Sequence, residues 1–429
     1  MPAKANKTDV PIDPRQIGGL KRLRHILPLL ASLREVGCER DKAGNRELHF
    51  DQYVTLVLLC LFNPILDSVR ALQQAGAMEK VSGQLGVKRF SLGSFSESVR
   101  VFDPDKLKAV VQQLAGELKP VNADPRVKQH LTQTLKIVDG TVLDAIVTVA
   151  QAAWLPFQDG TAKHAWRLHV NFDFDTWCPD VADGVTLTDA RNSGKSDEKN
   201  VLRTKLKADC CYVTDRWFGQ FTLFNDIHAI GSSYVCRVKE NSAFDVVEER
   251  LLSDEALKAG VVRDAVVTMG LSSKPADKPN HAIRIIVIEA APHAKRGGRR
   301  GKTAGPGNKG TIVIATNLLH VPAEIIALIY QHRWAIEIFY RFFKQIPGCR
   351  HLLSQKPEGI LIQVYCAVIA CLLMNLWTGK RPNKRTFEML AFYFMGVASE
   401  RELLDHLSRP DQTGVKLRAK DELWKKLGY

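Results

Sequence analysis

The chain has 429 residues, 45% of them hydrophobic, and carries a formal net charge of +14. This length allows a large buried core divided among about two to four domains. A basic excess of this size favours a polyanionic partner, nucleic acid before membrane. The nine cysteines form no CxxC pair, and no histidine pair has zinc-ligand spacing. These features indicate a reducing compartment and argue against structural zinc.

The N-terminal part predicts a tail followed by helices. Residues 1–16 are polar and contain proline, so we expect a disordered tail without a signal peptide. Residues 17–119 have helical periodicity, which predicts a small all-helical domain. Basic residues of this domain are candidates for phosphate contacts, although each could equally be an ordinary surface residue: Lys21, Arg22, Arg24, Lys88 and Arg89.

A mixed α/β pattern follows. Residues 120–241 read as three strands, a helix, a strand, a helix and a strand, which predicts a mixed sheet. Residues 242–310 contain further β-like runs and a glycine-rich basic loop with Arg299 and Arg300. This loop cannot bury a core, and its charge suits a phosphate backbone. A strand then leads the chain back into helices.

The C-terminal part contains one long apolar run. Residues 360–377 carry no charged side chain, and a run of this length reaches the lower limit for a membrane span. The run stands alone and is interrupted by Gln363 and Asn375. We therefore expect a buried core helix and no membrane partner. Further helices are predicted for residues 379–429.

The segment Tyr330–Lys344 predicts one continuous helix between Pro322 and Pro347. On a helical wheel, Tyr330, Arg333, Glu337 and Lys344 share one face. Apolar side chains occupy another face and can pack into a core: Ile329, Ile336, Phe339 and Phe343. The segment could be an ordinary amphipathic helix with a solvated face, unless other residues supply partners for Glu337.

Two aspartates are candidates to join Glu337. Asp139 lies within an apolar strand, and Asp215 ends the fourth strand of the mixed sheet. Open α/β sheets place functional groups at the carboxyl ends of their strands, and the first and fourth strands of a mixed sheet can be neighbours. Three carboxylates together would suit two Mg²⁺ ions, with Mn²⁺ as the alternative, in phosphodiester chemistry. Arg333 and Lys344 would then bind phosphate.

These residues carry a resemblance to a known family. The spacing of Tyr330, Arg333, Glu337 and Lys344 is similar to the Tyr-Arg-Glu-Lys motif of bacterial insertion-sequence transposases of family four. The segments IVDGT at 137–141 and VTDRWFGQF at 213–221 resemble the two aspartate motifs of that family. The resemblance extends over about residues 90–380.

The resemblance implies a fold and a domain plan. It implies an α/β, RNase H-like mixed-sheet catalytic core with a mostly β insertion, an all-helical N-terminal domain and C-terminal helices. The core would occupy residues 120–241 and 311–378, with the insertion at 242–310. The helical domain at 17–119 would bind terminal inverted repeats, and the helices at 379–429 would help to form a homodimer on the DNA ends.

The resemblance also implies roles for residues. Asp139, Asp215 and Glu337 would be the catalytic, metal-binding residues. The expected DNA contacts are Tyr330, Arg333, Lys344, Arg341, Arg237, Lys239, Arg299 and Arg300. Trp217 stands where the family often has glycine. Trp217 and Trp334 are candidates to stack on an unpaired base, although core packing is the expected role of Trp217.

The resulting hypothesis is a cytoplasmic, nucleoid-associated bacterial transposase that cuts and joins double-stranded DNA, both transposon ends and target. Two alternatives remain open. An RNase H-like, structure-selective endonuclease would keep the three carboxylates without strand transfer. A catalytically inactive, domesticated DNA-binding protein would use only the basic surface.

Overall fold

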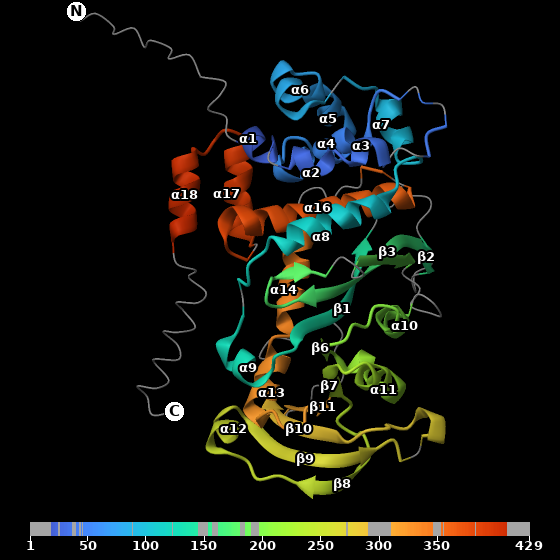
Figure 1. Ribbon diagram of the computed structural model, residues 1–429, viewed down its shortest axis with the longest axis vertical. Helices are drawn as coiled ribbons and strands as arrows, with labels where there is room; N and C mark the ends of the chain where they lie inside the picture. The colour runs from blue at the N-terminus through green and yellow to red at the C-terminus, as the bar shows by residue number, and fades with distance from the viewer. Residues whose placement is uncertain are drawn as a thin grey trace, which may run out of the picture.

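The computed structural model describes residues 19–409, except for residues 25, 37–39, 43, 45, 88, 122, 145–152, 157–161, 181–184, 190–196, 272, 291–309, 346–352, 355 and 382. The expected tail at 1–16 and the basic loop with Arg299 and Arg300 lie outside the described residues. Figure 1 shows helices at one end of the molecule and strands toward the other.

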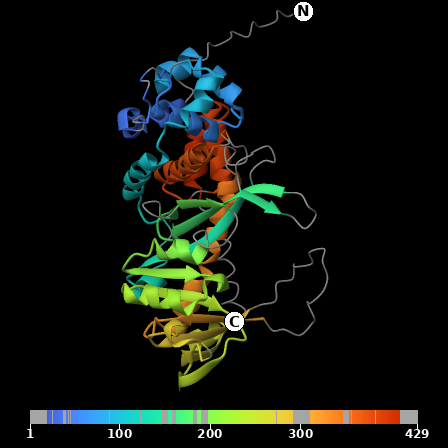
Figure 2. The same cartoon turned by 90° about the vertical axis from the view of Figure 1, so that its right-hand side faces the viewer.

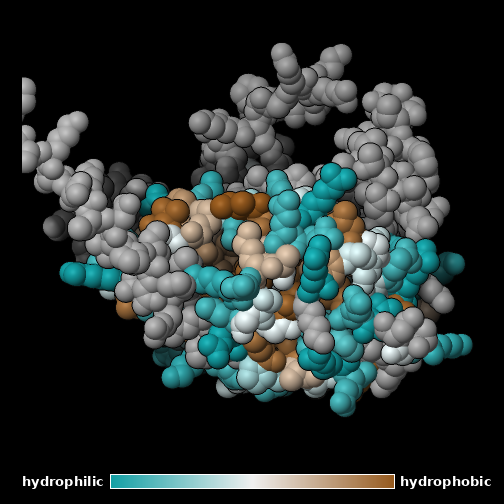
Figure 3. Space-filling model, turned by 90° about the horizontal axis from the view of Figure 1, so that it is seen from above, coloured by the Kyte–Doolittle hydropathy of each residue, from teal (hydrophilic) through white to brown (hydrophobic). Residues whose placement is uncertain are grey.

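The N-terminal helices lie at the helical end of the molecule. Its elements are α1 (Gly19–Arg24), α2 (Leu27–Leu30), α3 (Leu33–Val36), α4 (Phe50–Phe62), α5 (Val69–Gly76), α6 (Glu79–Leu85), α7 (Leu92–Ser98), the 3-10 helix η2 (Pro104–Lys106) and α8 (Leu107–Gly116). Helix α4 is buried along nearly its whole length because it is apolar on all sides. Figure 3 shows this end from above, with hydrophilic side chains interspersed with hydrophobic ones.

The C-terminal helices complete the core of the helical end. They are α16 (Pro357–Thr378), α17 (Lys384–Phe394) and α18 (Glu400–Ser408), and Figure 1 shows α16 crossing between the N-terminal helices and the sheet. Helix α16 packs on α4 and α8. The Phe62 and Phe394 rings stack at 4.9 Å, and Arg22 forms a 3.0 Å ion pair with Glu400. The two ends of the chain therefore share one core.

Helix α16 confirms the prediction of a buried helix. By length and composition alone it could cross a membrane, but 89% of its apolar window is buried inside the protein. Its polar residues are hydrogen-bonded: Asn375 donates to the carbonyl of Thr176 at 2.9 Å, and the side chain of Gln363 accepts from the amide of Leu353 at 3.0 Å. This is the environment of a helix in a protein core.

Among the described residues, eleven strands form one mixed sheet. They are β1 (Thr134–Asp144), β2 (Ala153–Pro156), β3 (Ala162–Asp173), β4 (Cys178–Pro179), β5 (Val185–Asp189), β6 (Cys210–Thr214), β7 (Ser233–Val238), β8 (Phe244–Glu249), β9 (Val261–Met269), β10 (Ile283–Ala290) and β11 (Gly310–Thr316). The order is β2-β3-β1-β6-β7-β11-β10-β9-β8, and both β4 and β5 pair with β3. Strands β1, β6 and β7 are parallel to one another. The expected neighbourhood of the first and fourth strands, β1 and β6, is confirmed.

Residues 242–310 are rich in strands, but their strands belong to the same sheet as the rest. Strand β11 pairs with β7 on one side and with β10 on the other. The sheet therefore runs without interruption from β1 to the edge strand β8. The domain boundaries given above remain predictions.

Helices cover both faces of the sheet, as Figures 1 and 2 show. The remaining elements are α9 (Pro125–His130), α10 (Glu198–Arg203), η4 (Arg216–Phe218), α11 (Phe221–Ala229), α12 (Asp254–Lys258), η5 (Pro275–Asp277), α13 (Ala323–Gln331) and α14 (Trp334–Gln345). Alternate residues of β1 enter different cores: Ile137 packs in the core that contains α13 and α14, and Val138 in the core that contains α10 and α11. Side chains alternate between the faces of a strand, so this division assigns a face to every residue of the central strands.

Candidate active site

The two predicted aspartates lie at the same level of adjacent parallel strands. Ile137 on β1 pairs with Val213 on β6, so the same offset places Asp139 opposite Asp215. Thr214 in turn pairs with Cys236 on β7, and this offset places Arg237 beside Asp215. Residues at one level of a parallel ladder are about 5 Å apart between strands. The register thus aligns two acids and one base across three strands.

All three side chains face helices α13 and α14. Their odd-numbered strand neighbours Val213 and Val235, like Ile137, pack in the core with these helices. The even-numbered neighbours Tyr212 and Tyr234 pack in the opposite core. Because the strands alternate, Asp139, Asp215 and Arg237 emerge on the α13–α14 face.

The predicted continuous helix at 330–344 is wrong in one respect, since the structure contains two helices. Helix α13 ends at Gln331 and α14 begins at Trp334. At the junction the amides bond three residues back, from Arg333 to Tyr330 at 3.0 Å and from Ala335 to His332 at 2.9 Å. The His332 ring stacks on Phe174 at 4.3 Å. Tertiary contact at His332 therefore coincides with the break, which helical periodicity alone does not indicate.

Helix α14 is oriented by its apolar face, as predicted. Ile336, Phe339 and Phe343 are buried, and the Phe339 ring lies 5.0 Å from that of Phe172 on β3. Tyr340 donates its hydroxyl proton to the carbonyl oxygen of Asp139 at 2.8 Å. These contacts dock α14 on β1 with Glu337 one turn before the hydrogen bond.

One pocket of about 370 Å³ brings the predicted residues together. Its lining consists of Asp139, Asp215, Arg216, Arg237, Tyr330, Arg333 and Glu337. Six of these seven are residues that the sequence singled out. Arg216 is the addition, and its position directly after Asp215 was the signal that could have found it.

Charged contacts inside the pocket are short. Arg333 donates to Glu337 at 2.8 Å, with side chains 14% and 32% exposed. Burial by itself lowers the pKa of Arg333, but its hydrogen bond to Glu337 and the negative charges of Glu337 and Asp139 outweigh this effect and raise it. Burial raises the pKa of Tyr330, against the opposing effect of Arg333 and Arg237. Both residues therefore keep their protons at neutral pH.

A second hollow of about 810 Å³ adjoins this pocket and shares three of its residues, Asp215, Arg216 and Arg237. Its lining also includes Trp217 and Lys239. Lys239 is exposed just after β7. The predicted DNA contacts Arg237 and Lys239 therefore lie in one continuous surface with the carboxylates.

Both tryptophans that the sequence singled out are at the surface. Trp217 is 49% exposed and Trp334 is 46% exposed. The expectation that Trp217 packs in the core is wrong, because the next residue, Phe218, takes the buried position of the 3-10 turn. The ammonium of Lys199 lies 4.3 Å from the centre of the Trp217 ring. Lys344 and Arg341 lie on α14, but their side chains are outside the described residues.

The donor chemistry of the pocket fits a divalent cation such as Mg²⁺. Asp139, Asp215 and Glu337 offer carboxylate oxygens, which Mg²⁺ and Mn²⁺ prefer. In the described part of the chain, no three acidic, histidine or cysteine side chains are grouped so that they could hold a metal ion. Asp215 accepts a hydrogen bond from the amide of Trp217 at 2.9 Å, and Glu337 accepts one from Arg333 at 2.8 Å. Holding a metal therefore requires these carboxylates to reorient.

The comparison with known families agrees with this geometry. The family model described as Transposase DDE domain matches residues 131–373, more than half of the chain. The chain belongs to the DDE transposase family. The matched range begins just before β1 and ends within α16, so it includes every residue that lines the pocket.

Curated relatives of this transposase are similar over most of their length. A putative transposase, y4zB, of Sinorhizobium fredii is 26% identical over 300 residues, covering 69% of this chain and 74% of the relative. A probable transposase for insertion sequence element IS5377 of Geobacillus stearothermophilus is 25% identical over 310 residues, covering 72% of each chain. A piggyBac transposase in a synaptic complex with hairpin DNA has a TM-score of 0.40 at 10% identity, covering 92% of this chain and 80% of that one.

Proposed function

We propose that this DDE transposase is encoded by an insertion sequence of family four, cuts DNA at the ends of that element and joins them to target DNA. The observation that supports the proposal most is the pocket in which Asp139, Asp215 and Glu337 meet Tyr330, Arg333 and Arg237. Acidic side chains and basic side chains that can bind phosphate line the same small volume. The core that presents them is, in this proposal, RNase H-like.

The basic residues of the pocket position the DNA. Arg333 and Arg237 present guanidinium groups that can form charge-assisted hydrogen bonds with a phosphate. Tyr330, whose pKa is raised, keeps its proton and can donate to a phosphate oxygen. Arg333 already donates to Glu337 at 2.8 Å, so its guanidinium would bind the phosphate and this carboxylate together. These groups would hold the phosphodiester at the transposon end against the three acids.

Asp139, Asp215 and Glu337 would hold the metals. Two divalent ions bound there would lower the pKa of the attacking water and stabilise the leaving oxygen. In the first reaction, water adds to the phosphorus and one P–O bond breaks, leaving a 3′-hydroxyl on the element. In the second, that hydroxyl attacks a target phosphodiester, so one P–O bond forms as another breaks. The exchange of one phosphodiester for another requires no ATP.

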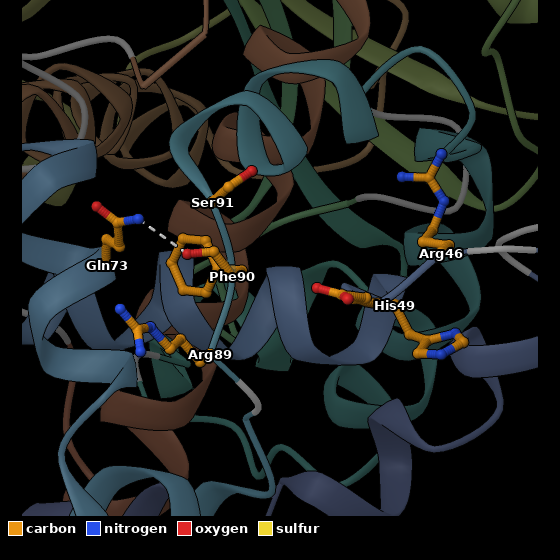
Figure 4. Close-up of a pocket in the computed structure, with 7 residues that line it drawn as sticks. Arg46, His49, Gln73, Arg89, Phe90 and Ser91 are labelled. Carbon is orange, nitrogen blue, oxygen red and sulfur yellow. Dashed lines mark hydrogen bonds between the residues drawn. The ribbon is translucent and has the colours of Figure 1, made fainter.

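The helical end would bind the terminal inverted repeats. A hollow of about 700 Å³ lies there, and its lining consists of Arg46, Glu47, His49, Gln73, Arg89, Phe90 and Ser91. Figure 4 shows these side chains, with all but Glu47 labelled. Arg46 already pairs with Asp41 at 3.0 Å and donates to Ser98 at 2.8 Å, so its role is structural. Arg89 is exposed at the rim and is the better phosphate ligand. Arg22, bound to Glu400, is a weaker candidate than the sequence indicated.

The remaining parts of the proposal concern the DNA and the cell. A homodimer would hold the two transposon ends, using the C-terminal helices. Trp217, beside the pocket, and Trp334 are proposed to stack on an unpaired base. The enzyme would act in the bacterial cytoplasm, associated with the nucleoid.

The proposal is tested with Asp139→Asn, Asp215→Asn and Glu337→Gln on a supercoiled donor plasmid carrying the element ends. Each variant is expected to lose cleavage in Mg²⁺ or Mn²⁺ while binding the ends within about twofold of wild type, since the metal, not the protein fold, is lost. Asp245→Asn, at an exposed residue of strand β8, is the control and retains full cleavage. Wild-type cleavage by the Glu337→Gln enzyme would refute the assignment.

Two assays separate the alternatives. Joining of a pre-cut end to target plasmid distinguishes a transposase from a structure-selective endonuclease, which would cut and not join. A metal titration followed by a nicking assay distinguishes both from an inactive DNA-binding protein. Inverted repeats flanking the reading frame would support the insertion-sequence assignment.

A further inference from the structure

The segment that connects strand β11 to helix α13 is held by a buried arginine. Arg284, on β10, donates to the carbonyl oxygens of Leu318 at 3.1 Å, Leu319 at 3.4 Å and Val321 at 2.5 Å. These three carbonyls belong to the short connector that ends at Pro322, the N-cap of α13. One side chain therefore binds most of the connector.

The guanidinium of Arg284 is itself fixed by Asp264 on the neighbouring strand β9. The two groups form a bidentate pair at 2.7 and 2.6 Å, with side chains only 4% and 5% exposed. Removing two charges from water is unfavourable unless their remaining hydrogen bonds are satisfied. The connector carbonyls satisfy them, so the pair and the connector depend on each other.

A second arginine supports the same connector. Arg250, which follows β8, donates to the carbonyl oxygen of Leu319, and its amide bonds the carbonyl of Asp264 at 2.9 Å. Arginines from two places in the 242–310 region thus converge on one short segment. Helix α13 also packs directly on β9, β10 and α12 of that region.

The connector leads directly into the active site. Helix α13 begins at Ala323 and carries Tyr330 near its end; Arg333 and Glu337 follow across the break. A shift of the connector therefore moves the N-terminal end of the helix pair that carries three of the pocket residues. Misplacement of catalytic groups by about 1 Å can slow a reaction about 100-fold.

We propose that Arg284 is a positioning residue for the DDE reaction, and that the strands of the 242–310 region serve to place α13 and α14 against Asp139 and Asp215. This inference rests on the proposed function of the pocket. In this proposal the strands of the 242–310 region contribute to the reaction without contacting DNA.

The test compares Arg284→Lys with Arg263→Lys in the full-length protein. Lysine keeps a charge beside Asp264, but its three N–H donors cannot serve both oxygens of that carboxylate and the three connector carbonyls together. Arg263 is the matched control. It directly precedes Asp264 on β9 and forms an exposed ion pair with Glu249. Arg250→Gln is the second variant in case Arg284→Lys does not fold, because it removes one connector contact without leaving a buried charge.

Three measurements are made below the unfolding temperature of each variant. Arg284→Lys is expected to bind transposon ends within about twofold of wild type and to cleave them about 10-fold to 100-fold more slowly at saturating DNA. Amide hydrogen exchange is expected to rise over residues 317–331 and to stay unchanged in α16. Arg250→Gln should show the same pattern at a smaller amplitude.

The outcomes separate this inference from the proposed function. A wild-type enzyme that does not cleave refutes the proposed function. A wild-type enzyme that cleaves, with Arg284→Lys cleaving at the same rate or only in proportion to its folded fraction, refutes the positioning role. Unchanged exchange over residues 317–331 in both Arg284→Lys and Arg250→Gln also refutes it.

Discussion

The hydroxyl of Tyr340 joins the two elements that carry the proposed catalytic acids, and Tyr340→Phe removes it. Tyr340 is on α14, three residues after Glu337, and donates to the carbonyl oxygen of Asp139 on β1 at 2.8 Å. The side chain is buried, and burial raises its pKa well above the ordinary range, with a further contribution from Asp139. The hydroxyl is therefore protonated and donates at all physiological pH values.

The magnitude follows from the loss of one buried hydrogen bond. A net hydrogen bond contributes about 0.5–1.5 kcal/mol, and an acceptor left unpaired costs about 1–3 kcal/mol. The Asp139 carbonyl has a second lone pair, so we expect the lower part of this range, a loss of about 1–2 kcal/mol in the free energy of unfolding. If about 1 kcal/mol is also lost from the transition state, cleavage slows about fivefold.

The assay measures urea unfolding and single-turnover cleavage of a pre-formed complex with transposon ends. Tyr393→Phe is the control, because the Tyr393 hydroxyl is buried on α17 without a hydrogen bond of good geometry, although Arg22 lies nearby. That variant should keep wild-type cleavage. If Tyr340→Phe matches wild type in both stability and cleavage, the hydroxyl does not hold α14 to β1, and the proposed docking of Glu337 is wrong.

Three further predictions follow. Lys344→Ala should weaken binding of cleaved ends and lower the slope of log affinity against log salt by about one; an unchanged slope would exclude a phosphate contact. Trp217→Ala should slow a step that needs an unpaired base, with less effect in Trp217→Phe, whereas equal rates on all substrates would exclude stacking. Burial and the neighbouring His228 lower the pKa of His281 to about 4, below the unfolded value of about 6.5. The unfolded state therefore binds more protons, and about 1–2 kcal/mol of stability, reduced for partial exposure, is present above pH 6.5 and lost toward pH 4. Urea unfolding of His281→Gln should show a flatter pH profile than wild type, and parallel profiles would contradict this.

Much of the candidate site could be predicted because each acid has a local signal. An aspartate inside an apolar strand, as at Asp139, requires a compensating partner. An aspartate at a strand end, as at Asp215, marks the functional edge of a sheet. Glu337 lies on a helix whose apolar stripe defines what faces inward. Periodicity and strand ends are local properties, and they indicated which residues face the same space.

What could not be predicted depends on contacts distant in the chain. The break after α13 coincides with the stacking of His332 on Phe174, about 160 residues earlier. Trp217 is exposed because the adjacent Phe218, and not Trp217, packs in the core. The alignment of Arg237 with Asp215 depends on strand register, which only the assembled sheet fixes. None of these has a signature in a short window of sequence.

The shared core of the helical end has a consequence for the order of folding during synthesis. Helix α4 is apolar on nearly all sides, and its partners α16 and α17 are about 300 residues later. Synthesis proceeds at about 5–20 residues per second, so the first hundred residues emerge from the ribosome long before these helices have been made. Helices α2, α3 and α5 can pack on α4 at once, but the face of α4 that packs on α16 and α17 stays uncovered for about 15–60 seconds. We expect chaperones to bind this segment during translation, and the helical end to acquire its native core only after α16 and α17 have been synthesised.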